Sequence, residues 1–430
     1  MMRPYTEYQQ SDISWLGKVP KHWTKNKFKF LLNEKPKTQN LELPCGSISF
    51  GHVVFKDSER LSEETKAAYQ EVLSGEFLIN PLNLNYDLKS LRTALADIDV
   101  IVSSGYIVLK SLDVVDKAYL RWLLYLFDVH HMKTLGAGIR QTISFKDIAD
   151  CAVYIPNDSE QKAIATFLDR ETQRIDSLIE EKQTFIKLLK EKRQALISHV
   201  VTKGLNPDVE MQDSGIEWIG QVPKHWEKCR VKQVSSFITS GPRGWSDFIS
   251  DNGNAIFLQS GDLNNELGLN LAKAKKVSPP DGAEGQRTQL QLDDVVVCIT
   301  GANTGRVALV KELDSTVYIN QHLSLIRPIG EKVRPKYLAY FLSSEAGSRY
   351  YALEQYGLKE GLSLKNIAET PLMLPPVSEQ TSIEKYLDKA LATLSSLVTS
   401  VEESIHLLKE HRTSLISAAV TGKIDVREAV

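Results

Sequence analysis

The sequence is poor in the features that mark several protein classes. Its 4 cysteines, Cys45, Cys151, Cys229 and Cys298, are far apart and form no CxxC pair, which argues against a zinc ribbon or a disulfide scaffold and suits a reducing cytoplasm. No run of about 18 apolar residues occurs, so we expect no membrane span, and the first residues lack the apolar stretch of a signal peptide. The formal net charge is only −2, so any binding of nucleic acid must use local patches.

Most motifs of catalysis are missing as well. Gly301–Gly305 lacks the length and the following Lys of a Walker A loop, and no dinucleotide-binding GxGxxG or zinc-binding HExxH occurs. Asn80-Pro81-Leu82-Asn83 lacks the second Pro and the aromatic residue of an adenine methyltransferase signature. Pro280-Asp281 with Glu284 has no E-x-K to complete a nuclease site. We therefore expect no catalysis by this chain, although a dispersed triad would leave no motif because triads are spatial.

What the chain does contain is an internal duplication. Residues 11–23 read SDISWLGKVPKHW and residues 214–226 read SGIEWIGQVPKHW, with nine of thirteen positions identical. The string GIRQTISFKDIADCAVYIP at 138–156 also returns as GLKEGLSLKNIAETPLMLP at 357–375. Gly17 and Pro20 predict a turn whose tryptophans anchor it by burial. The alternative is that Lys21, His22 and Trp23 form a binding surface.

Two long helices are predicted, over 159–204 and 378–422. In the first, Leu168, Ile175, Lys182, Leu189 and Leu196 recur every seven residues, and the second repeats them 219 residues later as Leu387, Leu394, Val401, Leu408 and Leu415. In the first helix Leu178 and Phe185 fill the intervening d positions, and the stripe is widened by Ile179, Ile186 and Val200. The second stripe is completed by Leu391, Leu397, Val398 and Ile405. Sustained heptads predict a supercoiled helix that needs a partner, and roughly 45 residues would extend about 65 Å. We expect the two helices to pair, with N-caps at Asp158 or Ser159 and at Ser378.

Between these landmarks lie two variable bodies, in which short strands are predicted at 75–80, 100–109 and 152–156 and a helix at Asp116–Phe127. In the second body, 293–310 predicts two strands around a tight loop, 318–328 another strand, and 333–344 the counterpart of the 115–127 helix. The 430 residues, 42% of them hydrophobic and 25% charged, are ample for two to four domains.

This layout resembles the specificity (S) subunit of Type I restriction-modification enzymes. The residues that carry the resemblance are SxIxWxGxVPKHW at both starts, EQxxI at both helix openings (Glu160 to Ile164, Glu379 to Ile383), and the tails VTKGL (201–205) and VTGKIDVR (420–427). The first body departs by lacking the TGxxxGR string found at 300–306.

The resemblance implies an α+β fold in which two target recognition domains, in a pseudo-two-fold arrangement, are separated by two long antiparallel coiled-coil helices. The expected segments are 1–155 (first recognition domain), 156–205 (first spacer helix), 206–226 (connector and repeated turn), 227–375 (second recognition domain) and 376–430 (second spacer helix). It also implies a complex on double-stranded DNA with two methyltransferase (modification) subunits and ATP-driven restriction subunits. S-adenosylmethionine and ATP with Mg²⁺ would then belong to those partners, and this chain would hold neither cofactor nor metal.

Because the duplicated chain carries two unlike bodies, it predicts an asymmetric, two-part DNA site with an unread gap of fixed length. Base edges are read by Arg at guanine and by Asn or Gln at adenine, and loops between strands can supply these side chains. Gly241, Gly301 and Gly305 would allow close backbone approach. The candidate readers are Asn83, Asn85, Lys89, Arg92, Arg140 and Gln141 in the first body, and Arg243, Trp245, Asn303, Arg306, Gln321 and His322 in the second. For each of them the competing interpretation is a solvated loop residue or a turn former.

Charge alone does not identify the bodies as DNA binders. Residues 24–155 contain 16 Lys and Arg against 16 Asp and Glu, and residues 227–375 contain 17 against 16. We therefore expect partner subunits to supply much of the phosphate contact. Two other functions stay open on sequence grounds: a coiled-coil scaffold without base readout, and an enzyme with a self-contained active site.

Overall fold

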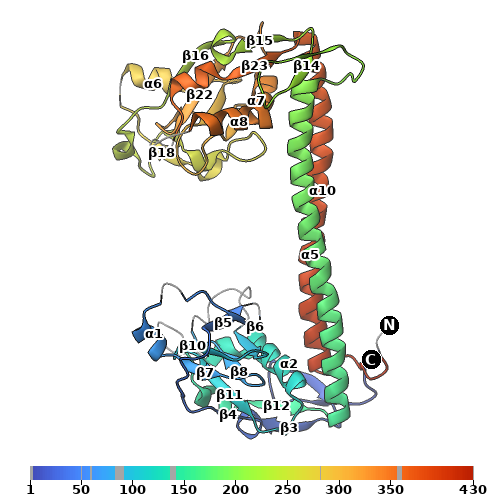
Figure 1. Cartoon of the computed structure of the whole chain (residues 1–430). Coiled ribbons are helices and arrows are strands. Elements are labelled where there is room, and N and C mark those ends of the chain that lie inside the picture. The colour runs from blue at the N-terminus through green and yellow to red at the C-terminus, as the bar shows by residue number, and fades with distance from the viewer. Residues whose placement is uncertain are drawn as a thin grey trace. The chain divides into compact units, whose positions relative to one another are not determined.

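The regular structure consists of two long helices, several shorter helices and several sheets of short strands, an α+β fold (Figure 1). The computed structural model describes residues 3–49, 51–58, 61–82, 92–135, 142–280, 282–355 and 361–429. Contacts divide the chain into two units: unit 1 is Met1–Lys182 with Glu403–Val430, and unit 2 is Gln183–Glu402. Each long helix therefore contributes a part of its length to each unit.

Unit 1 is built on a mixed six-stranded sheet in the order β4-β11-β8-β9-β6-β5, accompanied by the two-stranded sheets β1-β2, β3-β12 and β7-β10. Its elements are β1 (Tyr8–Gln10), β2 (Lys18–Pro20), β3 (Thr24–Lys27), η1 (Phe28–Phe30), β4 (Leu32–Glu34), β5 (Gly46–Ser49), β6 (His52–Phe55), α1 (Glu63–Ala67), β7 (Gln70–Val72), β8 (Phe77–Ile79), β9 (Thr93–Leu95), β10 (Val100–Val102), β11 (Ile107–Ser111), α2 (Lys117–Phe127), the π-helical turn η2 (Asp128–Met132), α3 (Lys133–Leu135), α4 (Phe145–Ala149) and β12 (Ala152–Ile155).

Unit 2 repeats this plan on a four-stranded sheet in the order β16-β22-β19-β20, with the smaller sheets β18-β17-β21, β13-β14 and β15-β23. Its elements are β13 (Met211–Asp213), β14 (Gln221–Pro223), β15 (Glu227–Arg230), η3 (Val231–Gln233), β16 (Ser235–Ser240), η4 (Trp245–Phe248), β17 (Ala255–Leu258), η5 (Ser260–Asp262), η6 (Leu271–Lys273), β18 (Lys275–Val277), α6 (Ala283–Thr288), β19 (Val295–Cys298), β20 (Val307–Leu309), β21 (Val317–Ile319), β22 (Leu323–Pro328), α7 (Pro335–Ser343), α8 (Glu345–Glu354), α9 (Leu364–Glu369) and β23 (Pro371–Leu374).

The central strands of unit 2 are apolar at each position because both of their faces are covered. Along β19, Val295 and Val297 pack into the cluster that contains α7 and the ends of both long helices. Val296 and Cys298 point the other way, into a second cluster with residues of β17 and β21. The period of two follows from the pleat of the strand, and burial of each such side chain stabilises the fold by about 1.5–3 kcal/mol. The sheet is thus the middle layer of unit 2.

The long helices α5 (Asp158–Lys203) and α10 (Val377–Val420) pack against each other within each unit. In unit 2, Ile197 and Val201 near the end of α5 share a core cluster with Ile383 and Leu387 near the start of α10. In unit 1, Arg412 near the end of α10 pairs with Asp176 in the first half of α5 at 2.9 Å. The two helices therefore run antiparallel, as expected.

Several predicted details of the helices are wrong. The helix α5 is capped by Asn157, whose side-chain oxygen accepts the Glu160 N–H at 3.0 Å, and α10 begins at Val377, after Pro376. The Asn157 side chain accepts the N–H of the third helical residue, so Asn157 is the N-cap and Asp158 is the first residue of the helix. Two predicted stripe members, Phe185 and Leu397, are 43% and 40% exposed. The buried seam between two paired helices is narrower than the stripe that the sequence suggests.

Two predicted strands are each divided in two. Residues 100–109 form β10 and β11, which belong to different sheets. Residues 318–328 form β21 and β22, separated at Asn320, whose side-chain oxygen accepts the His322 N–H at 3.0 Å. This local turn, favoured by Asn, ends one strand and starts the next. The predicted helix at Asp116–Phe127 and the strand pair within 293–310 are confirmed.

Candidate nucleic-acid interface

The ends of several strands of unit 2 meet at one edge of its sheets. Because β16 and β19 both run antiparallel to β22, the ends of β16 and β19 lie beside the start of β22, and β20 begins there too. The strand β17 is parallel to β21, so the end of β17 reaches the same edge. We call the segments 241–245, 259–263, 299–306 and 320–322 the loop edge of unit 2. Segments distant in the sequence become neighbours because of the strand order alone.

Backbone contacts hold these segments closely together. The Ile299 N–H donates to the His322 carbonyl at 2.9 Å, and the Thr300 hydroxyl bonds to the His322 ring. A Cβ placed on Gly241 would lie 2.1 Å from the Ile319 carbonyl oxygen, so this position requires glycine. Gly241 thus allows a close backbone approach, as predicted, but the segment that it approaches belongs to the protein itself.

The predicted readers of the second body divide into two groups. Arg243, Gln321 and His322 are exposed, and Arg243 makes no hydrogen bond or ion pair with the residues that the structure describes. Asn303 and Arg306 are half-buried and hold neighbouring segments: the Asn303 amide donates to the Ser260 carbonyl at 3.2 Å, and Arg306 Nη1 donates to the Leu263 carbonyl at 3.0 Å. All six predicted residues therefore lie in segments of the loop edge, and three of them, Arg243, Gln321 and His322, are exposed.

Trp245 has a different place from the one predicted. It is 3% exposed and packs in a core cluster with Phe257 and Val277. Its ring lies 5.3 Å from that of Tyr318 in an edge-on arrangement. A side chain covered in this way anchors the loop that carries Arg243, and the structure offers no face of it to a duplex.

Sequence reasoning missed the segment 259–263. It follows β17 and reaches the loop edge through the parallel pairing of β17 with β21, for which the sequence has no short-range signal. Its Asp262 accepts the Gln259 N–H at 2.7 Å, and burial raises the pKa of this carboxyl despite that hydrogen bond and nearby Lys275. The polar Gln259 and Ser260 are partly exposed beside Asn320 and its neighbours.

Unit 1 has an equivalent edge. The order β4-β11-β8-β9 matches β16-β22-β19-β20, so the connection between β8 and β9 corresponds to the 299–306 loop. Asn83, Asn85, Lys89, Arg140 and Gln141 lie outside the described residues. Arg92 is 6% exposed, and its Nε donates to Asp128 at 2.8 Å. Its buried ion pair makes it inaccessible to DNA in this conformation.

The repeated EQ pair and the repeated KHW string form the attachment of each recognition body to its helix. Gln161 accepts the Asp116 N–H at 2.7 Å and donates to the Pro156 carbonyl at 2.9 Å. Gln380 does the same for Arg334 and Pro375, at 2.8 Å each. The first residues of each long helix are thereby tied to the start of α2 or α7.

The glutamates of the EQ pairs hold the repeated turns. Glu160 accepts from His22 Nε2 at 2.8 Å and from Trp23 Nε1 at 3.1 Å, and the corresponding Glu379 bonds to His225 Nε2 at 2.8 Å. Trp23 is 3% exposed. The KHW strings therefore serve as structural anchors, as the burial interpretation predicts.

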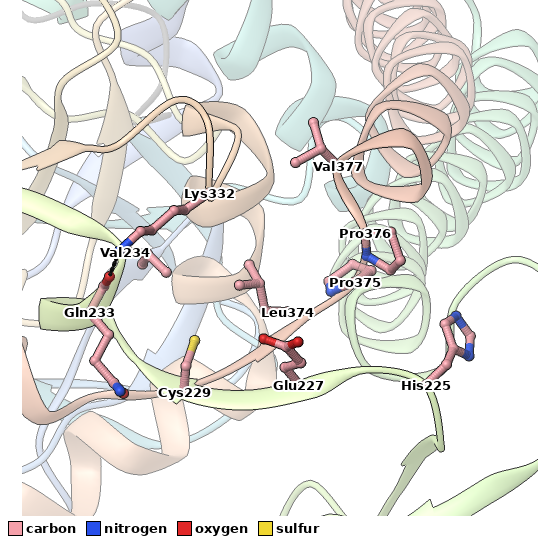
Figure 2. A pocket seen from close by; sticks show the side chains of 10 residues that line it. All are labelled: His225, Glu227, Cys229, Gln233, Val234, Lys332, Leu374, Pro375, Pro376 and Val377. Atoms are coloured by element: carbon pink, nitrogen blue, oxygen red, sulfur yellow. Dashed lines mark hydrogen bonds between the residues drawn. The ribbon is translucent and has the colours of Figure 1, made fainter.

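A cavity of about 550 Å³ lies at the other edge of the unit 2 sheet, beside the start of α10 (Figure 2). Figure 2 shows Leu374 and the two following prolines on one side, with Glu227 and Cys229 nearby. Burial raises the pKa of the Cys229 thiol to about 11, so the thiol stays protonated and is a poor nucleophile at neutral pH. The cavity is thus a gap between framework elements, remote from the loop edge.

Two features are absent from the described parts of the chain. No cluster of three or more His, Cys, Asp or Glu side chains suited to a metal ion is found among those residues. Within the same residues, no helix is both long and apolar enough to cross a bilayer.

Comparison with known proteins places this geometry in a family. The family model described as the Type I restriction modification DNA specificity domain matches residues 84–188 and 223–405, more than half of the chain. The specificity subunit of the EcoBI Type I restriction enzyme from Escherichia coli is 24% identical over 297 residues, which are 66% of this chain and 60% of that protein. The StySPI specificity subunit from Salmonella potsdam is 22% identical over 277 residues, 63% of this chain and 57% of that protein. The matches thus span somewhat under two thirds of these relatives.

Solved structures share the fold. A chain from work on complex assembly and conformational transition of the type I R-M system has a TM-score of 0.67 at 15% identity, covering 94% of this chain and 98% of that one. The HsdS subunit from Thermoanaerobacter tengcongensis has a TM-score of 0.51 at 16% identity, with coverage of 94% and 98%. With its duplicated sheets, its paired helices and the matched family model, the chain belongs to the Type I restriction-modification DNA specificity family.

Proposed function

We propose that this chain is the DNA-recognition subunit of a Type I restriction-modification complex. Each unit reads one half of an asymmetric, two-part site on double-stranded DNA. The chain contributes recognition, and partner subunits carry out the chemistry. The family match and the relatives named as specificity subunits support this assignment.

One observation carries the proposal: the same sheet edge occurs twice, with different side chains. The strand order β4-β11-β8-β9 of unit 1 recurs as β16-β22-β19-β20 in unit 2. In unit 2 that edge exposes Arg243, Gln321 and His322, which have the donors and acceptors that base edges require. A scaffold without readout would have no need of guanidinium, amide and imidazole groups gathered at one edge.

The long helices fit the role of a spacer between the two half-sites. Their antiparallel packing within each unit gives each recognition body a fixed attachment through Gln161 or Gln380. One helical turn advances about 5.4 Å, close to one or two base-pair steps of about 3.4 Å. The number of helical turns would then set the length of the unread gap.

The partners that we propose follow from the family match and from the repetition of helices and turns. Two methyltransferase subunits would dock on the repeated helices and turns, one at each copy, and restriction subunits would join for cleavage. S-adenosylmethionine and ATP with Mg²⁺ then belong to those subunits. The near-neutral recognition bodies support a division of labour in which the partners supply much of the contact with phosphates. Four unpaired cysteines suit work in a reducing cytoplasm.

The direct test is to map methylated adenines in the host genome with and without this gene. The proposal predicts an asymmetric two-part motif that disappears on deletion and returns on complementation. A methylome that is unchanged by the deletion, or a lost motif that is short and continuous, would contradict the proposal. Deletion of a partner methyltransferase gene is the matched control and should remove the same motif.

A further inference from the structure

Arg92 and Arg306 occupy equivalent positions in the two units. Thr93 of β9 pairs with Ile79 of β8, just as Val307 of β20 pairs with Val297 of β19. The carbonyl of Arg92 accepts the Asn80 N–H at 2.8 Å, and that of Arg306 accepts the Cys298 N–H at 2.8 Å. Each arginine is thus the last residue of its loop, immediately before the returning strand. The arginine of the TGxxxGR string thus has a structural counterpart in the first body although the string is absent there.

Both side chains are bonded to the protein, through different partners. In unit 2, Arg306 Nη1 donates to the Leu263 carbonyl at 3.0 Å, which ties the 299–306 loop to the segment 259–263. In unit 1, Asp128 at the end of α2 accepts the Arg92 N–H at 2.9 Å and its Nε at 2.8 Å. Arg92 is 6% and Asp128 2% exposed, so this pair is shielded from solvent and screened little by salt.

A second bond strengthens the connection in unit 2. The Asn303 amide donates to the Ser260 carbonyl at 3.2 Å, parallel to the bond between Arg306 and Leu263. Two bonds between the same pair of segments restrict their relative position more than one bond does. The apex of the 299–306 loop is therefore presented together with 259–263 as one surface.

We propose that Arg92 and Arg306 are positioning residues for base readout that do not contact DNA themselves. Arg306 fixes the 299–306 loop against 259–263, and Arg92 fixes the start of β9 against the end of α2. This inference rests on the proposed function, because it presupposes two half-sites. Both arginines suggest guanine readers by residue type, yet each acts through the segments that it holds in place. Exposed Arg243 is the contrasting case, with a guanidinium free to meet DNA.

The two roles have different signatures in DNA binding. A residue that contacts phosphate contributes to the release of counterions, so its loss makes log K depend less steeply on log salt concentration, by a slope of about 1. A residue that contacts one base affects discrimination at that base pair only. A positioning residue affects several base pairs of one half-site and leaves the salt dependence unchanged.

The experiment uses the full chain in complex with its modification subunits and a library of duplexes with single mismatches in each half-site. For Arg306→Ala we expect a roughly tenfold loss of discrimination, spread over several base pairs of the half read by unit 2. The other half-site and the salt dependence should match the wild type. Arg306→Lys retains a donor for the Leu263 carbonyl and should recover most of the discrimination. Arg243→Ala is the matched control: if the exposed guanidinium reads a base edge, its loss should reduce discrimination at one base pair only.

Asp128→Asn and Arg92→Ala provide the counterpart in unit 1, with the loss confined to the other half-site. Loss of discrimination at one base pair together with a lower salt slope would show that Arg306 contacts DNA, and would overturn the inference. Unchanged discrimination would also overturn it, as would loss in both halves with a lowered unfolding temperature, which indicates general destabilisation. If the wild-type complex itself shows no two-part motif, the proposed function fails first, and the two failures are distinguishable.

Discussion

Units 1 and 2 share a framework whose details recur residue by residue. Trp122 on α2 of unit 1 donates to Asp169 of α5 at 2.7 Å. At the equivalent place in unit 2, Tyr340 on α7 donates to Asp388 of α10 at 2.9 Å. A buried acid precedes the central strand in both units, Glu76 before β8 and Asp294 before β19. Each accepts a backbone N–H three residues earlier, at 2.9 and 2.7 Å. The framework tolerates a change of residue type as long as the hydrogen bond remains.

The units differ at the loop edges and in how strongly the repeated turn is fastened. Asp128 holds Arg92 in unit 1, whereas a backbone carbonyl holds Arg306 in unit 2. Trp23 Nε1 bonds to Glu160, whereas the buried Trp226 Nε1 has no hydrogen-bond partner among the described residues. The comparison teaches that the duplication preserved the attachment to the helices and the strand order, while the edge that would face DNA diverged. That is the pattern expected of one scaffold with two specificities.

The largest expected effect comes from lengthening both long helices by one turn. If the two halves of each helix separate two independent readers, both half-site sequences should persist and only the unread gap should grow, by one or two base pairs. The methylated motif of the variant measures this directly. Insertion of one turn in α5 alone is the control and should impair pairing of the helices. A changed half-site sequence would break the comparison between independent units.

Removing the buried acids tests whether the frameworks are energetically equivalent. Glu76→Ala leaves Lys35, whose side chain is 6% exposed, with Glu71 as its remaining carboxylate partner and removes the acceptor of the Leu73 N–H, so about 3 kcal/mol is expected in unit 1. Asp294→Ala leaves Arg327, which is 27% exposed and can reach water, so about 2–3 kcal/mol is expected in unit 2. Hydrogen exchange resolves the two units separately. A greater loss for Asp294→Ala would contradict this ranking by burial.

The free energy that attaches the repeated turn to its long helix should differ between the two units by a smaller amount. Glu160→Gln weakens charge-assisted bonds to both His22 and Trp23 and should destabilise the β1-β2 turn by about 1–2 kcal/mol. Glu379→Gln affects one bond at a site where the glutamate side chain is 26% exposed, so about 0.5–1 kcal/mol is expected for β13-β14. Amide exchange in the two turns measures both values. Equal losses would show that the unpartnered Trp226 does not mark a weaker attachment.

The smallest effect on stability is expected at Leu188 and Leu407. These positions are 219 residues apart and are 54% and 64% exposed, so serine at either one should change stability by less than about 0.5 kcal/mol. If modification subunits dock on the repeated helices, each substitution should weaken the binding of one of two such subunits. Native mass spectrometry of the complex gives that stoichiometry. Leu189→Ala, at a 6% exposed position, is the control and should cost about 2–4 kcal/mol.

The fold was predictable from the sequence to the extent that it repeats. The heptads and the two copies of the starting string predict paired helices and two bodies, and the structure confirms both. The exposure of Phe185 and Leu397 was not predictable, because the width of a buried stripe depends on how the partner helix lies. Two long apolar stretches read as single strands because the turn at Asn320 and the change of sheet after Val102 depend on tertiary pairing.

The candidate site was predictable by residue type and only partly by role. Polar residues beside Gly301 and Gly305 correctly indicated a loop at a strand end, and the structure gathers Arg243, Gln321 and His322 there. Sequence could not tell that Arg92 and Trp245 are buried, because an arginine next to an unknown carboxylate looks the same as a free one. It missed 259–263 because only the parallel pairing of β17 with β21 brings that segment to the edge.

The central claim is that two unlike loop edges on a repeated framework read two unlike half-sites. The most direct test replaces residues 227–375 with those of a relative that has a different second body, and then maps the methylated motif of the host. The account predicts that one half of the motif changes to that of the donor while the other half and the gap stay as they were. A change in both halves, or a motif that stays the same, would contradict it.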